Sequence, residues 1–297
     1  MRASRSTLQG RHVALALAVV AIWGSNFVVI KVGLRDLPPF LFAALRFFFC
    51  AIPFAAFRRR PAVRWRWLAA YGALLGAGQF GVLFYAMRAD IPPGLASLVI
   101  QVQVFFTIGL SVLLFGERIP NATLLGGVVS AAGLALIAAR TDATVTHLGV
   151  LLVLVAALAW AGANISVKCA AREAKAPIDM VAFIAWASLF ATPPLVVLSL
   201  VFEGPATVWH ALGHAGLAAW GAVFWQVVAN TLFGYAAWSW LLTRYDAAVV
   251  SPYSLLVPVI GMASSAALLG EPLGMYKLLA FAFVLGGIAI HAVGVKK

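Results

Sequence analysis

The residues that could do chemistry in this sequence are polar side chains set inside long apolar stretches. The stretch AIWGSNFVVIKVG holds Trp23 and Asn26, which lie three residues apart and so share one face of a helix. A later stretch, AWAGANISVKCA, holds Trp160 and Asn164, and both stretches carry a lysine eight residues after the tryptophan. Indole N–H groups donate hydrogen bonds, and amides both donate and accept them. These residue types predict the binding of a small polar molecule, not the making or breaking of bonds.

Further side chains of the same kind lie in other apolar stretches. Gln226 and Asn230 are four residues apart on one predicted helix, and the remaining candidates are Gln79, Gln101 and Tyr253. A lining of neutral amides and aromatic rings suits zwitterions or mildly polar metabolites. The alternative is that these amides hold helices together by hydrogen bonds between them.

Two other features narrow the candidate set. Gln101 and Gln103 are two positions, or about 200°, apart on a helix, so we do not expect both to face one cavity.

Arg46 lies about 12 Å inside its predicted span at 1.5 Å per residue, and no acidic residue occurs at a comparable depth. We favour a structural role for Arg46, in which it donates to carbonyls of neighbouring helices. Its functional alternative is to receive a substrate carboxylate.

The composition requires a lipid environment around these residues. Of the 297 residues, 64% are hydrophobic and only 10% are charged, with a mean hydropathy of +1.01. A soluble domain carries about a quarter charged residues. The net charge of +12 does not indicate a nucleic-acid partner, because the lysines and arginines are scattered as short groups between apolar runs. The expected partners are therefore the lipid bilayer and a small-molecule substrate.

The apolar runs predict an all-α polytopic membrane protein with ten transmembrane helices. A membrane helix needs about 20 mostly apolar residues. The predicted spans cover about 13–30, 38–57, 67–87, 93–115, 121–139, 148–167, 178–202, 215–242, 247–269 and 277–295. The first run is expected to be retained and not cleaved, because it continues into WGSNFVVIK without a small-residue cleavage site.

The distribution of positive charge predicts the orientation. With the N-terminus in the cytoplasm, the cytoplasmic segments hold fifteen lysines and arginines and the opposite side holds five. Cytoplasmic loops of membrane proteins carry the excess of such residues. Both termini are therefore expected in the cytoplasm.

The repeated sequence motifs predict two copies of a five-helix unit. The stretch LLFGE at 113–117 ends the fourth span, and ALLGE at 267–271 ends the ninth. Because five is odd, the second copy, 148–297, is inserted upside down relative to the first, 1–140. Inverted repeats are typical of secondary transporters, whose substrate site lies near the membrane midplane between the halves.

The motifs resemble those of a known family. They are WGSNFVVIKVGL, the LRF at 45–47, PPGLASLVIQVQVFFTI at 92–108, FGER at 115–118, SPYSLLVPVIGM at 251–262 and LLGE at 268–271. Together they look like the EamA family of the drug/metabolite transporter superfamily, over essentially all ten spans. The resemblance implies an inner-membrane secondary transporter of bacteria that exports amino acids or related metabolites, with cysteine and O-acetylserine as the best candidates.

Other function classes find less support in the sequence. There is no GxxxxGK[ST] phosphate loop, no HExxH motif and no aspartate pair within the spans, and the five histidines lack ligand spacing. We therefore expect no enzyme activity, no cofactor and no metal. The remaining alternatives for the function are a drug exporter, a nucleotide-sugar carrier and a channel. The protein could also form a homodimer. Glu117 and Glu271 are expected to pin helices together by bonding helix-end amides or a nearby cation, and not to carry protons.

Overall fold

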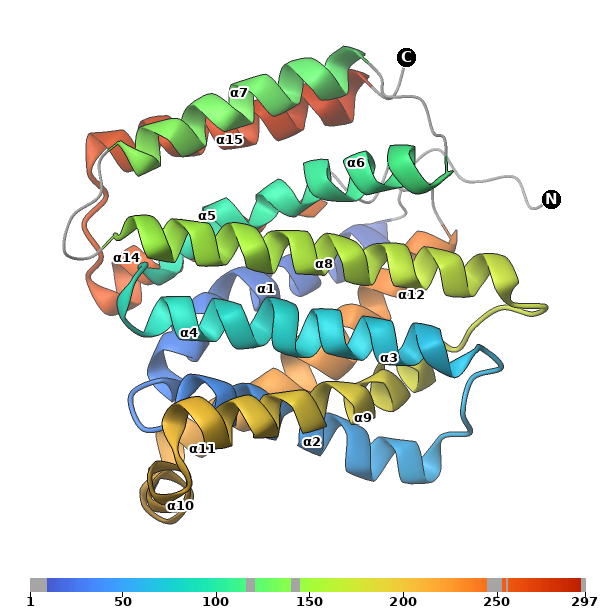
Figure 1. Ribbon diagram of the computed structural model, residues 1–297. Helices are drawn as coiled ribbons and strands as arrows, with labels where there is room; N and C mark the ends of the chain where they lie inside the picture. The colour runs from blue at the N-terminus through green and yellow to red at the C-terminus, as the bar shows by residue number, and fades with distance from the viewer. Residues whose placement is uncertain (1–9, 116–120, 140–144, 245–252, 255, 295–297) are drawn as a thin grey trace.

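The protein is a bundle of long helices that run nearly parallel to one another (Figure 1). The computed structural model describes residues 10–115, 121–139, 145–244, 253–254 and 256–294. Within these ranges every regular element is a helix, in agreement with the predicted all-α class.

In the described part of the first half, two of the long helices change helix type along their length. A π-helical segment, η1, joins α3 to α4, and a short 3₁₀ turn, η2, joins α5 to α6. The bounds are α1 (Gly10–Gly33), α2 (Pro39–Phe57), α3 (Trp65–Ala73), η1 (Leu74–Gly81), α4 (Val82–Ala89), α5 (Pro93–Val99), η2 (Ile100–Val102), α6 (Gln103–Phe115) and α7 (Asn121–Ala138).

The described part of the second half also contains π-helical segments. The π-helical segment η4 joins α11 to α12, and η3 extends α9. The bounds are α8 (His147–Glu173), α9 (Met180–Leu198), η3 (Ser199–Glu203), α10 (Pro205–His214), α11 (Leu217–Trp225), η4 (Gln226–Tyr235), α12 (Ala236–Arg244), α14 (Leu256–Leu269) and α15 (Met275–Gly294).

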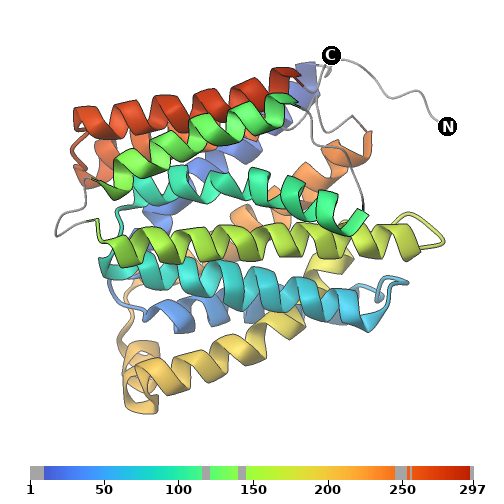
Figure 2. The ribbon, with the colours of Figure 1, turned by 45° about the horizontal axis from the view of Figure 1, so that its top comes forward.

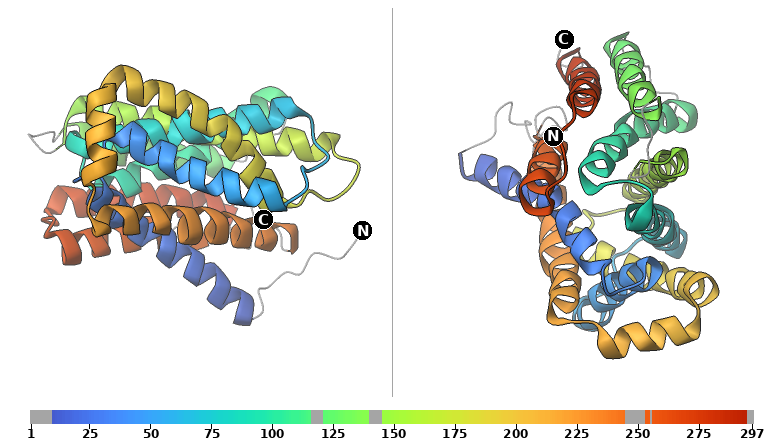
Figure 3. Two further views of the ribbon diagram at one scale, coloured as in Figure 1. Left: turned by 90° about the horizontal axis from the view of Figure 1, so that it is seen from below. Right: turned by 90° about the vertical axis from the view of Figure 1, so that its left-hand side faces the viewer.

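Helix α10 is not predicted by the sequence pattern, which places a break between spans there. Gly204 adopts a φ of 83°, and Pro205 then occupies the first helical position, where its missing N–H costs nothing. The helix lies across one end of the bundle, roughly at right angles to the long helices (Figures 1 and 3).

The chain crosses a membrane several times by the length and composition of its helices. Seven continuous helical stretches are long and apolar enough for a span. The other three expected spans coincide with shorter apolar stretches in α7, α14 and α15, namely Leu124–Gly133, Leu256–Leu269 and Met275–Gly287. A multi-pass membrane protein is therefore confirmed, while the count of ten stays a prediction.

Helices from the two halves pack in matching pairs. Helix α2 packs along α9, and α7 packs along α15, as Figures 1 and 2 show. Helix α1 packs against α14 and α5, whereas α8 packs against α6. If α1 corresponds to α8 and α5–α6 corresponds to α14, the pair α1–α14 is equivalent to the pair α8–α6.

Small residues permit some of these close approaches. A Cβ on Gly76 would meet Ala191 of α9, and one on Gly24 of α1 would lie 2.6 Å from Cβ of Ile260 in α14. The GALLG stretch at 72–76 thus brings two helices together, as small residues do in membrane proteins.

The two ends of the bundle differ in the connections they carry. We call one end the α10 end; it holds α10 and the connections 34–38, 90–92 and 270–274 (Figure 1). The opposite end holds the connections 58–64 and 174–179. Helix α1 begins, and helix α15 ends, at that opposite end (Figure 1).

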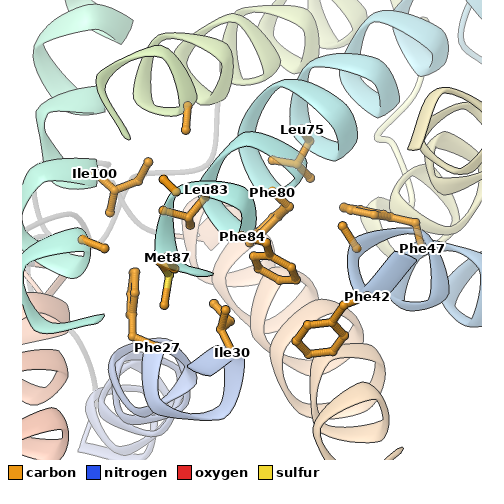
Figure 4. Close-up of a cluster of buried hydrophobic side chains, with 14 of the residues drawn as sticks. Phe27, Ile30, Phe42, Phe47, Leu75, Phe80, Leu83, Phe84, Met87 and Ile100 are labelled. Carbon is orange, nitrogen blue, oxygen red and sulfur yellow. The ribbon is translucent and has the colours of Figure 1, made fainter. Parts of the chain in front are cut away.

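The core beside the central helices is aromatic. Figure 4 shows Phe42, Phe47, Phe80 and Phe84 gathered between α2 and the η1–α4 helix. The ring centroids of Phe42 and Phe84 are 5.0 Å apart, and those of Phe80 and Phe84 are 5.8 Å apart, within the range of favourable aromatic pairs. Two of its members, Phe47 and Phe80, lie beside the guanidinium of Arg46.

Candidate functional site

Arg46 of α2 is fully buried at the centre of the bundle. Its Nε donates to Oγ1 of Thr231 at 2.8 Å, and its Nη1 donates to Oε1 of Gln226 at 2.9 Å. The guanidinium also lies 3.6 Å from the centre of the Phe80 ring, a cation–π contact. These hydrogen bonds go to side chains of η4, whereas the sequence suggested main-chain carbonyls.

Two asparagines complete this group. One terminal atom of the Asn230 amide lies 2.9 Å from Oε1 of Gln226, 3.2 Å from both terminal nitrogens of Arg46 and 3.1 Å from Nδ2 of Asn26. As the nitrogen, this atom donates to Gln226; as the oxygen, it accepts from Arg46 and Asn26 instead. We call the group the central polar cluster. Gln79 belongs to it through Tyr235, whose side chain hydrogen-bonds both Gln79 and Arg46. Its members are all buried: Asn26, Arg46, Gln79, Gln226, Asn230 and Thr231.

Three atoms of the central polar cluster have no hydrogen-bond partner among the described residues. They are Oδ1 of Asn26, Oε1 of Gln79 and Nε2 of Gln226, which makes two acceptors and one donor. A buried polar atom left unpaired costs about 1–3 kcal/mol, so such groups usually mark a ligand or a water. Together with the Arg46 cation, the cluster can accept a carboxylate on its donors and an ammonium on its free oxygens.

The cluster is positioned by π-helical segments in both halves. Gln79 and Phe80 belong to η1, while Gln226, Asn230 and Thr231 belong to η4. In η4 the Thr231 hydroxyl donates to the main-chain oxygen of Gln226 at 2.6 Å, five residues back, which satisfies a carbonyl at the wide turn. π-turns occur frequently at functional sites. No feature of the sequence pattern predicted them.

Trp23 packs against the edge of the cluster. Its Nε1 donates to the main-chain oxygen of Asn230 at 3.4 Å, and its ring lies 5.2 Å from that of Tyr235. A Cβ on Gly234 would lie 2.5 Å from the same Nε1, so the indole fits only because residue 234 is glycine.

Asn164 belongs to a second, separate group. Its Nδ2 donates to Oε1 of Gln103 at 3.1 Å and to Oγ1 of Thr107 at 3.3 Å. These three residues, the second polar cluster, are half-buried between α6 and α8. Trp160 is half-buried one turn before Asn164 and packs against the hydrophobic core. Asn26 and Asn164 are therefore not partners in one group.

Gln101 and Tyr253 lie outside both clusters. Nε2 of Gln101 donates to the main-chain oxygen of Ser254 at 3.0 Å, so Gln101 and Gln103 have different partners, as their spacing predicted. Tyr253 is half-buried and packs on the apolar pair Ala16 and Leu241.

The sequence did not indicate Thr231, Phe80 or Thr107, and it set Gln103 apart from the candidate Gln101. Thr231 and Phe80 directly follow the candidates Asn230 and Gln79, and only the wide turns of η4 and η1 bring them to Arg46. Gln103 and Thr107 are four residues apart on α6, a spacing that could have indicated a shared face.

Two residues near the α10 end connect helices. Oε2 of Glu271 accepts from the main-chain N–H of Gly94 at 3.2 Å, which confirms that Glu271 pins two helices. Nζ of Lys31 donates to the main-chain oxygens of Met87 and Arg88 at 3.1 and 3.2 Å. Glu117 lies outside the described residues.

Comparison with known proteins identifies the family. The model of the EamA-like transporter family matches residues 11–139 and again 147–293. A protein of Escherichia coli (strain K12) named "Probable amino-acid metabolite efflux pump" is 39% identical over 284 residues, covering 95% of each chain. A Salmonella typhimurium protein of the same name is 39% identical over 282 residues, covering 94% of each chain. The "Uncharacterized transporter YoaV" of Bacillus subtilis is 29% identical over 257 residues, covering 83% of this chain and 84% of that one.

A solved structure supports the fold. This structure, described only as "Crystal structure of protein", superposes with a TM-score of 0.64 at 20% identity, covering 95% of this chain and 96% of that one. The family matches and the relatives extend over nearly the whole chain and name transporters, not enzymes. The chain belongs to the EamA-like transporter family, within the drug/metabolite transporter superfamily.

Proposed function

We propose that this protein is an inner-membrane secondary transporter that exports amino acids or closely related metabolites. The observation that carries the proposal is the central polar cluster: a fully buried arginine surrounded by neutral partners and by three unpaired polar atoms. Such a group is complementary to a small molecule that carries both a negative and a positive charge.

The chemistry of the cluster favours a zwitterion over a cation. Arginine stays protonated in proteins and presents a planar fork that matches a carboxylate. No acidic side chain of the described residues hydrogen-bonds Arg46. A substrate carboxylate would supply the missing negative charge, and a charge-assisted hydrogen bond of this kind contributes about 1.5–3 kcal/mol. The free oxygens of Asn26 and Gln79 are then available to the substrate ammonium.

Transport is proposed to occur by alternating access between two inverted repeats, 1–140 and 148–297. The family matches the chain twice, and the packing pairs α1–α14 and α8–α6 are equivalent under such a repeat. The central polar cluster draws on α1, α2 and η1 from the first half and on η4 from the second. A substrate bound there touches both halves, which is the requirement for a carrier of this type.

The proposed orientation places both termini in the cytoplasm and the α10 end outside. The end opposite α10 carries Arg58, Arg59, Arg60, Arg64 and Arg66 in and beside a single connection. Cytoplasmic loops are enriched in such residues.

The proposed substrates are cysteine, O-acetylserine and similar small amino-acid derivatives. The names of the two relatives at 39% identity, and the resemblance of the motifs, point in this direction. The alternative is a drug or other small-metabolite exporter of the same superfamily.

Overexpression in a bacterial host tests the proposal. Cells that overproduce the protein are expected to accumulate extracellular cysteine and related thiols, and to tolerate a toxic excess of them. If they do neither but become resistant to lipophilic cations, the drug-exporter alternative replaces the proposal.

A further inference from the structure

A carboxylate joins the two halves of the chain at the α10 end of the bundle. Glu271 follows α14 in the second half, and its Oε2 accepts from the main-chain N–H of Gly94, at the start of α5 in the first half. The fit is close, because a Cβ on Gly94 would lie 2.7 Å from that oxygen and 3.5 Å from Cα of Met262. Any parting of the halves at this end must break the contact.

The second oxygen of this carboxylate is not satisfied. Oε1 of Glu271 is buried and has no hydrogen-bond partner among the described residues. An ionised oxygen that is removed from water without a partner is costly, whereas a neutral carboxylic acid is much less so. The closed contact therefore suits the protonated form of Glu271 better than the ionised one.

The charges around Glu271 compensate for this burial only in part. Lys31 faces it from α1 and Lys277 from α15, while α5 contributes the N–H of Gly94 and Arg35 adds positive charge near Lys31. Nζ of Lys31 is bonded to main-chain oxygens of α4, so Lys31 acts on the carboxylate only through space. Burial raises the pKa of Glu271, and this effect exceeds the lowering by the Gly94 N–H and the two lysines.

We propose that Glu271 is a proton-binding site: it takes up a proton when the two halves close over it at the α10 end and releases the proton when they part. In the parted form the carboxylate returns to water, where a glutamate pKa is about 4.3. Since the pKa is higher in the closed form, the proton favours closure, and closure is lost as the pH rises through that pKa. This inference rests on the alternating access proposed above.

The site would make the rate of export depend on the pH outside, without moving a proton across the membrane. With the α10 end outside, an emptied carrier that faces outwards binds a proton at Glu271 and closes, ready to return. An acidic exterior would then speed the return step without any acidic residue at the substrate site.

The test follows the width of the α10 end as a function of pH. Arg88 of α4 and Leu273 between α14 and α15 are exposed and belong to different halves. In a chain whose two native cysteines are replaced, R88C and L273C carry spin labels, and the distance between the labels is measured by pulsed electron resonance in phospholipid nanodiscs from pH 4 to pH 9. The full-length protein is used without substrate. We expect a short distance at low pH and a growing population of a long distance above the usual glutamate pKa.

The difference in the pKa of Glu271 between the two forms sets how strongly the distance ratio depends on pH. The ratio of short to long distances should change about tenfold for each unit by which the two forms differ in pKa. In E271Q, which imitates the protonated acid, the short distance should persist at every pH. In E271D the response should remain but with a shifted midpoint, so this variant serves if E271Q does not fold.

The matched control is Asp36→Asn. Asp36 also joins the halves at the α10 end, through Oδ2 to the main-chain N–H of Gly216 at 3.0 Å, but it is exposed. D36N should keep the pH response of the parent. A response that survives in E271Q, or a distance that never varies with pH in the parent, overturns the proposal. Because the labels report without substrate, either result leaves the export assay to decide the proposed function by itself.

Discussion

Replacing Arg46 by glutamine tests the central polar cluster most sharply. The change removes the cation that lies 3.6 Å over Phe80 and the donors to Thr231 and Gln226. If a substrate carboxylate binds Arg46, the loss of one charge-assisted hydrogen bond costs about 1.5–3 kcal/mol, or about 10- to 150-fold in affinity. Transport into inverted membrane vesicles should therefore show a higher KM for the substrate.

A comparison of substrates separates binding from folding. The parent should prefer an amino acid over its carboxamide, which lacks the negative charge, by about the same 10- to 150-fold. In R46Q this preference should largely disappear, because the partner of the carboxylate is gone. Arg46→Lys should recover only part of it, since lysine cannot form the planar fork.

Thr231→Val is the structural control for this experiment. It removes the acceptor of Nε without removing the charge, and should lower the stability by about 0.5–1.5 kcal/mol. Its preference for the carboxylate should match the parent. If R46Q retains the parent's preference and loses only protein abundance, Arg46 is structural and the substrate site lies elsewhere.

Three further predictions follow from the same geometry. Gly234→Ala should displace the Trp23 indole and lower the stability by about 1–3 kcal/mol. Gly221→Ala should leave the stability unchanged, because a Cβ there meets nothing within 4 Å. Thermal unfolding in detergent compares the two variants. For the next test, Cys50 and Cys169 are replaced and a cysteine is placed at Asn26 or at Asn164. The cysteine at the half-buried Asn164 should react faster with a small hydrophilic thiol reagent than the one at the buried Asn26. Inert thiols at both sites in an active protein would assign both asparagines to packing. A reporter fused after Lys297 should be active only in its cytoplasmic form, and activity on the opposite side would contradict the proposed topology.

Much of the fold could be predicted because a helix that crosses the bilayer needs a long apolar stretch, which is visible in the sequence. Apolar length sets where helices lie, and the seven long described helical stretches follow seven of the predicted spans closely. The short helix α10 could not be predicted from apolar length, because it depends on the backbone of Gly204 and on Pro205.

The candidate site was predicted less completely. The sequence indicated Asn26, Arg46, Gln79, Gln226 and Asn230, which the structure brings together, but it grouped Asn164 with them. Helical spacing reports which residues share a face of one helix, not which helix that face meets. Thr231 and Phe80 reach Arg46 through π-helical turns, whose wider pitch shifts the face that an ideal helix would present.

Substrate counterflow in proteoliposomes tests the central claim most directly. Vesicles that contain the purified protein are loaded with unlabelled cysteine or O-acetylserine and diluted into a trace of the labelled compound. A carrier of amino-acid metabolites predicts a transient, saturable accumulation of label that depends on the internal substrate and is strongly reduced in R46Q. Accumulation that is absent for both compounds, or a flux that does not saturate, would contradict the account.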